Sequence, residues 1–252
     1  MFCGSLGLLI QYQNLKKDST FDMTGFDFTN VESLKSIYAV NLGVNVIFDE
    51  NFDTSNVKDF SAMFELSYLV EPLDYRIFDL SSAEYIAGFF SIYQGDELDV
   101  SDFKLNSITN ISSLFSGFDG KIIGLDKWDV SKVTNFNSLF NYYAYFDSVD
   151  ISNWDLSSAE STYSMFRLLY NIDILDLSTL NFGNSKDYRY MFMEGNDPYP
   201  SIIDISGSDW NEDALVDGMF LNHEGTTIYV KDEKAKVFIE KQAPDCIVLV
   251  KE

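Results

Sequence analysis

The chain of 252 residues contains only two cysteines, Cys3 and Cys246, which lie near its opposite ends. In an elongated repeat fold these residues would lie much farther apart than the roughly 7 Å between Cα atoms that a disulfide tolerates. We therefore expect no disulfide between them, and they do not indicate a redox compartment. The chain also lacks a run of about 18 apolar residues, so we expect no membrane insertion.

Positive charge is scarce, because 17 Lys and Arg residues face 40 Asp and Glu residues and give a net charge of −23. Such a chain would repel the phosphates of a nucleic acid, so nucleic acid is not an expected partner. An acidic surface favours solubility and cationic partners. After Gly225 the charge is balanced, with five Lys against five acidic residues, which predicts a distinct terminal element.

The usual signatures of catalysis are also missing. His223 is the only histidine, and the chain has no paired-cysteine metal motif, no glycine-rich phosphate loop and no GxSxG motif. We therefore expect that the protein is not an enzyme and has no cofactor. Two carboxylates suffice for a glycosidase, so a glycan-acting enzyme stays as an alternative. An acidic mimic of nucleic acid that inhibits a DNA-binding protein is another.

The sequence does contain a repeat, marked by an aromatic residue every 25 to 28 residues. We call these residues the anchor aromatics, and an apolar residue directly precedes each of them. Apolar residues also recur four and, in most units, seven positions before the anchor, which is the spacing of one helix face. Ser, Thr or Asn stands nine positions before the anchor in seven of the eight units, as a helix N-cap would. The anchors are Tyr38, Phe64, Phe90, Phe115, Phe140, Phe166, Phe192 and Phe220.

The first half of each unit has the alternating pattern of a half-buried strand. Apolar residues stand 17 and usually 15 positions before the anchor, with Asp between them in six units. We therefore predict an α/β repeat solenoid of the leucine-rich-repeat type, in which every coil has a short parallel strand and a short helix. The predicted domains are an N-terminal capping strand region at 1–20, an eight-unit solenoid at 21–225 and a strand-helix-strand cap at 226–252.

Several segments resemble the BspA-like repeat, whose units run Leu-Asp-x-Ser-x-Trp/Phe-Asp-x-Ser-x-Val and end on Met-Phe. The segments are LDKWDVSKVTNFNSLF at 125–140, VDISNWDLSSAESTYSMF at 149–166 and NFDTSNVKDFSAMF at 51–64. The resemblance covers about residues 21–220 and implies a leucine-rich-repeat-like solenoid in a surface-exposed adhesion or recognition protein, with no catalytic residues.

The sequence shows no clear signal peptide, wall-sorting motif or membrane anchor. We therefore expect an extracellular, virion-associated or tail protein of a phage that attaches to a host, with a bacterial cell-surface adhesin as the alternative. The expected partners are a host-surface glycan or protein and other virion or surface proteins.

Two groups of residues are candidates for binding. The strand aspartates Asp150, Asp176 and Asp204, with Ser152 and Ser178, form a polar row that could bind a sugar or Ca²⁺. The alternative is a solvated face whose carboxylates bond to nearby hydroxyls and backbone. The second group is the tyrosine-rich loop after Phe140, where some rings could instead point into the core. Its tyrosines are Tyr142, Tyr143 and Tyr145.

A second row of aspartates lies two residues before the predicted N-caps. Asp at this position usually bonds to the backbone two residues further on, so we expect a structural role for the row. Its members are Asp27, Asp53, Asp79, Asp129, Asp155 and Asp209.

Overall fold

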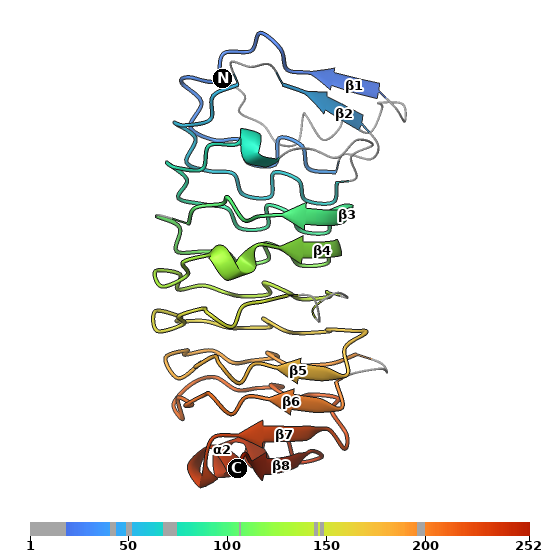
Figure 1. Cartoon of the computed structure of the whole chain (residues 1–252), viewed down its shortest axis with the longest axis vertical. Coiled ribbons are helices and arrows are strands. Elements are labelled where there is room, and N and C mark those ends of the chain that lie inside the picture. The colour runs from blue at the N-terminus through green and yellow to red at the C-terminus, as the bar shows by residue number, and fades with distance from the viewer. Residues whose placement is uncertain are drawn as a thin grey trace.

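Short parallel strands stacked one above another define the fold (Figure 1). The structure is a computed structural model that describes residues 19–40, 44–48, 52–67, 75–105, 107–143, 146, 149–195 and 200–252. The described chain forms an elongated stack of coils, with its N- and C-terminal parts at opposite ends. Most of the predicted N-terminal capping region and Cys3 lie outside the described residues.

All the paired strands run parallel. β1 (Ser19–Asp22) pairs with β2 (Val44–Ile47), and β3 (Gln94–Asp99) pairs with β4 (Asp119–Ile123). A four-stranded sheet follows in the order β5-β6-β7-β8. Its strands are β5 (Ile174–Asp176), β6 (Ile202–Asp204), β7 (Thr227–Val230) and β8 (Ile247–Val250). The protein is therefore a parallel β-solenoid, which confirms the prediction of a stacked repeat.

The prediction of a helix in every coil is wrong. The segment that ends at each anchor is a series of turns, and the residue two positions before the anchor has a left-handed φ of 53° to 67°. A right-handed helix cannot contain this conformation. Within the described residues the only α-helix is α2 (Glu233–Gln242), beside the 3₁₀ turns η1 (Tyr75–Ile77) and η2 (Leu125–Lys127). The left-handed residues are Ser36, Ala62, Gly88, Ser113, Ser138, Ser164, Tyr190 and Gly218.

Backbone hydrogen bonds in these segments alternate between two directions. The N–H groups of Phe60, Ala62, Phe64 and Leu66 donate to carbonyls of the next coil at 2.8–2.9 Å. The N–H of Met63 lies between them and donates back to the Phe60 carbonyl at 3.2 Å, which closes a turn. Every second amide thus joins two coils, whereas in a helix each amide would bond four residues back.

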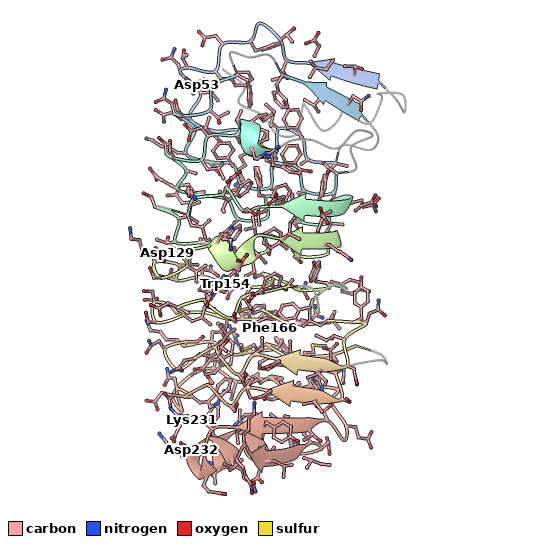
Figure 2. The ribbon with its side chains drawn as sticks, in the orientation of Figure 1. Asp53, Asp129, Trp154, Phe166, Lys231 and Asp232 are labelled. Carbon is pink, nitrogen blue, oxygen red and sulfur yellow. The ribbon has the colours of Figure 1, made fainter. Side chains whose placement is uncertain are left out.

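The anchor aromatics form the centre of the core. Their side chains are 0–3% exposed, and neighbouring rings stack with centroids 5.0–6.2 Å apart. A parallel column holds Phe103, Trp128 and Trp154 at 6.4 Å spacing. The Trp154 indole N–H also donates to the carbonyl of Leu125, 3.0 Å away. Figure 2 shows Trp154 and Phe166 inside the stack and Asp129 at its edge.

The helix α2 covers the C-terminal end of this core. It begins after Asp232, whose Oδ1 accepts the backbone N–H of Ala235 at 2.8 Å as an N-cap. Phe238 and Ile239 on its inner face are buried, and the Phe238 ring stacks on Trp210 at 6.0 Å. No helix in the described part of the chain is both long and apolar enough to cross a membrane.

Truncation of an anchor should destabilise the whole stack. We expect Phe140→Ala to lower the free energy of unfolding by roughly 3–5 kcal/mol, because it removes a fully buried ring that stacks on three others. Denaturant unfolding followed by circular dichroism measures the change. Tyr142→Ala is the control, since this ring is 56% exposed, and an equal loss in both variants would contradict the core assignment.

Candidate functional site

The predicted binding aspartates on the strand face are bonded to their own backbone. Each carboxylate accepts the backbone N–H two residues further on, at 3.1 Å in Asp150, 3.0 Å in Asp176 and 3.1 Å in Asp204. The Ser152 hydroxyl also donates to Asp150 at 2.7 Å. These are Asx turns, which shape the backbone where each strand ends.

The electrostatics of this row follow from those bonds. The Ser152 hydroxyl and, next, its backbone N–H lower the pKa of Asp150, and Ser178 does the same for Asp176. Asp204 is mostly buried and forms an ion pair with Lys251. Nowhere in the described chain do three or more His, Cys, Asp or Glu side chains form a group that could hold a metal ion. The structure thus does not bring the row together as ligands for Ca²⁺.

The second aspartate row has the same geometry. Five of its carboxylates accept a backbone N–H from the predicted N-cap residues at 2.8–3.0 Å. The predicted N-caps are therefore wrong, because these residues donate to an aspartate and begin no helix. The sixth, Asp209, forms an ion pair with Lys231 at 2.7 Å. The five are Asp27, Asp53, Asp79, Asp129 and Asp155, of which Figure 2 labels Asp53 and Asp129 at the edge of the stack.

The tyrosine-rich loop divides between core and surface. Tyr143 is fully buried and stacks on Phe118 at 6.3 Å, whereas Tyr142 is 56% exposed. Tyr142 meets Tyr170 edge to face at 5.7 Å, so two tyrosines of neighbouring coils lie together. Tyr145 lies outside the described residues.

Tyr142 belongs to a longer exposed row that the sequence reasoning missed. In seven of the eight coils the residue two positions after the anchor also has a left-handed φ, and in five of these it is apolar or aromatic. Leu66 and Ile92 are 41% and 44% exposed, and Gly117 separates Ile92 from Tyr142. We call this row the exposed apolar column. Leu66, Ile92 and Tyr142 in it are exposed, and Val40 and Leu168 at its two ends are half-buried. The left-handed φ could not be read from the sequence, because no glycine marks it at these five positions.

The groups that could serve nucleophilic or acid-base chemistry have structural surroundings. His223 is buried, and its Nε2 lies 2.6 Å from the carbonyl oxygen of Phe192, which can only accept a hydrogen bond. Burial lowers the pKa of His223 and raises the pKa of the Cys246 thiol to about 11. A neutral imidazole and a protonated thiol are the expected forms at neutral pH. The His223 Nδ1 lies 3.1 Å from the buried Thr226 hydroxyl, which is also 3.1 Å from the Pro200 carbonyl oxygen to which it donates.

Glu194 is a buried carboxyl group that sequence reasoning also missed. Its side chain is 4% exposed, and burial raises its pKa to about 8, although a backbone hydrogen bond from Leu169 and the charge of Arg167 act in the opposite direction. It stands two positions after Phe192, where other coils carry the exposed apolar column. A protonated carboxyl group at neutral pH is the consequence of this position.

The chain matches the model of a family described as "Mycoplasma protein of unknown function, DUF285". The two matches span residues 11–120 and 87–204 and together cover more than half of the chain. The chain belongs to this family. Neither a curated protein nor a solved structure matches the DUF285 chain. Family membership and the solenoid are both compatible with the resemblance to BspA-like repeat proteins.

The Asx turns of the DUF285 chain should tolerate Asn better than Ala. Asn181 already accepts the Gly183 N–H at 2.9 Å in the second aspartate row, so Asp155→Asn keeps an acceptor that Asp155→Ala removes. At pH 7 we expect the wild type and Asp155→Asn to have higher melting temperatures than Asp155→Ala.

Acid distinguishes the two variants further. The hydrogen bonds from Ser157 lower the pKa of Asp155, so its contribution is present above the unfolded pKa of about 4 and is lost as pH falls through the folded value. As the pH falls below the unfolded pKa and Asp155 becomes protonated, the difference in melting temperature between the wild type and Asp155→Ala should shrink, while that between Asp155→Asn and Asp155→Ala persists. Thermal melts across this range test the idea, and equal melting of all three proteins at pH 7 would refute it.

Glu194 should make the DUF285 chain less stable as pH rises. Its folded pKa of about 8 lies above the ordinary 4.5, so the folded state keeps a proton that the unfolded chain releases between these values. We expect Glu194→Gln to be more stable than the wild type at pH 8 by on the order of a few kcal/mol, with little difference at pH 4.

Urea unfolding at both pH values measures this difference. Glu160→Gln is the control, because the Glu160 side chain is 62% exposed. If the free energy of unfolding changes with pH in the same way in the wild type and in Glu194→Gln, burial does not raise the pKa of Glu194.

Proposed function

We propose that the protein is a non-enzymatic recognition solenoid that acts outside the cell, on a virion or a bacterial surface, and binds a glycan or protein of a host. The observation that carries the proposal is the exposed apolar column, which recurs at one position of several coils and is interrupted at Gly117. Single exposed apolar residues are common on proteins, whereas several that recur on one side of a stack favour a surface that another molecule covers.

Backbone conformation strengthens this argument. A left-handed φ costs a residue other than glycine on the order of 1 kcal/mol, and Ile92 is β-branched, which makes the conformation still less favourable. Gly117 shows that glycine fits the same column. Large apolar side chains at exposed and strained positions bring no benefit to the core, and strain of this kind is typical of functional positions.

The remaining chemistry supports binding in preference to catalysis. The strand aspartates engage their own backbone, and His223 and Cys246 are held in the forms expected for structural roles. A BspA-like repeat of about 25 residues, which the sequence resembles, would supply the long scaffold that such a protein requires.

Loss of the apolar column should abolish recognition. We expect the triple variant Leu66→Ser, Ile92→Ser, Tyr142→Ser to bind arrays of host glycans and surface proteins at least tenfold more weakly than the wild type. The matched control is Ile174→Ser with Ile247→Ser, which removes two side chains of similar exposure, 54% and 52%, from the strand face.

Immunogold labelling of source cells and of the phages they release tests the location. Labelling on cell surfaces or virions is the expected result. A chain that binds nothing on the arrays and is labelled only inside cells would overturn the proposal.

A further inference from the structure

The backbone ladder of the solenoid is interrupted between two adjacent coils. In the coils on either side, the carbonyl six positions before the anchor accepts N–H groups from the next coil, and the carbonyls of Lys58 and Thr109 each accept two. The equivalent carbonyl of Glu84 accepts neither the Thr109 nor the Asn110 N–H, although all three residues are described. The two coils therefore separate at this point.

The neighbouring bonds confirm the separation. Phe60 and Ile111 donate their N–H groups to the next coil at 2.8 Å and 3.1 Å, but the equivalent bond from Ile86 to the Asn110 carbonyl is missing from this described junction. The β-bridges show the same break, because Asp59 pairs with Tyr85 and Asn110 pairs with Asn135, while Tyr85 and Asn110 form no bridge. Backbone donors and acceptors that bond between coils elsewhere thus remain available here.

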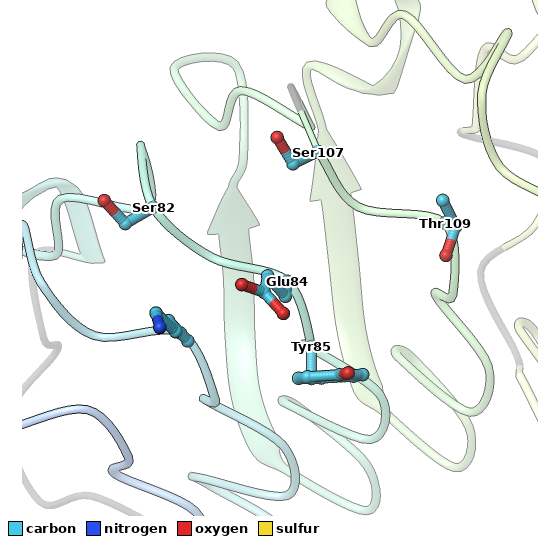
Figure 3. A pocket seen from close by; sticks show the side chains of 6 residues that line it. Ser82, Glu84, Tyr85, Ser107 and Thr109 are labelled. Carbon is cyan, nitrogen blue, oxygen red and sulfur yellow. The ribbon is translucent and has the colours of Figure 1, made fainter.

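A hollow of about 550 Å³ lies at this break. Figure 3 shows Glu84 and Tyr85 on one coil and Ser107 and Thr109 on the next. The volume falls within the roughly 300–1,000 Å³ that small-molecule sites occupy. The lining side chains are all exposed, and they are Lys58, Ser82, Glu84, Tyr85, Ser107 and Thr109.

The chemistry of this lining is balanced. Lys58 can only donate hydrogen bonds and the Glu84 carboxylate can only accept them, while the four hydroxyl groups of the serine, threonine and tyrosine side chains can do both. Lys58 and Glu84 form no ion pair with each other among the described contacts, so both can serve a ligand. The two charges cancel, and the hollow consequently favours neither an anion nor a cation.

Tyr85 adds an aromatic surface to this polar site. Its side chain is 53% exposed, unlike the anchor aromatics, which are almost completely buried. An aromatic ring offers a rigid apolar contact area with a polar tip. A ligand that matches the whole hollow needs many hydroxyl groups, no net charge and one apolar face, and a sugar ring has all three properties.

We propose that this hollow is a saccharide-binding subsite, with Tyr85 as the stacking platform and the Lys58, Glu84, Ser107 and Thr109 side chains as hydrogen-bond partners. The inference rests on the proposed recognition function and names the neutral glycan as the ligand class. The free backbone groups of the split junction, such as the Glu84 carbonyl and the Asn110 N–H, are further partners for hydroxyls.

Saturation-transfer NMR tests the subsite. The probes are lactose, maltose, cellobiose and N,N′-diacetylchitobiose, added to the full chain in millimolar excess. We expect C–H protons of at least one probe to receive saturation from the wild type, and Tyr85→Ala to weaken its binding at least tenfold. Thr109→Val, which keeps the shape of the side chain and removes its hydroxyl, should weaken the same probe to a smaller extent.

Leu215→Ala is the matched control, because it removes a large side chain that is 50% exposed from the same position of a distant coil, five residues before the anchor. Circular dichroism melts of every variant show whether the fold is retained. The subsite is refuted if no probe receives saturation from the wild type, or if Tyr85→Ala and Leu215→Ala change the signals equally. If the wild type binds the host arrays and Tyr85→Ala binds them equally well, the subsite is refuted and the recognition function stands. A wild type that binds neither the sugars nor the arrays refutes both proposals.

Discussion

Alternation of the backbone hydrogen bonds is the constraint on which the rest of the structure depends. In the turn segments, one amide bonds to the neighbouring coil and the next closes a turn within its own coil, as Phe64 and Met63 do. The left-handed residues near each anchor make this alternation possible, because they reverse the chain direction without a helix. Once the backbone is fixed in this way, equivalent side chains of successive coils come into register, and the anchor rings stack.

The sequence predicted the stacking but not the local conformation of each coil. The spacing of the anchors, the strand pattern and the burial of Phe64 or Phe140 all follow from the repeat. The helix prediction was wrong because a series of turns and a helix both bring a side chain to the same face every three or four residues. Ser, Thr and Asn in segments such as those before Phe140 and Phe166 favour turns over helices, and that signal outweighed the periodicity.

The candidate site was predictable only where it followed the repeat. The hydrogen bonds of the aspartate rows to nearby backbone could be predicted from the sequence, since Asp followed two residues later by Ser is a common turn pattern. Tyr142 stood out because its loop has more tyrosines than a core needs. Glu194 and the hollow beside Tyr85 depend on burial and on a break between coils, and neither has a marker in the residue pattern.

The direction of the inter-coil bonds also determines how the rod responds to force. These bonds run along the long axis, so a pull on the two ends of the chain would load every junction in series with the same tension. A rod loaded in this way opens first at its weakest junction. The break at residues 84–86 and 109–111 has fewer backbone bonds than the junctions beside it, so under tension it would open before either of them.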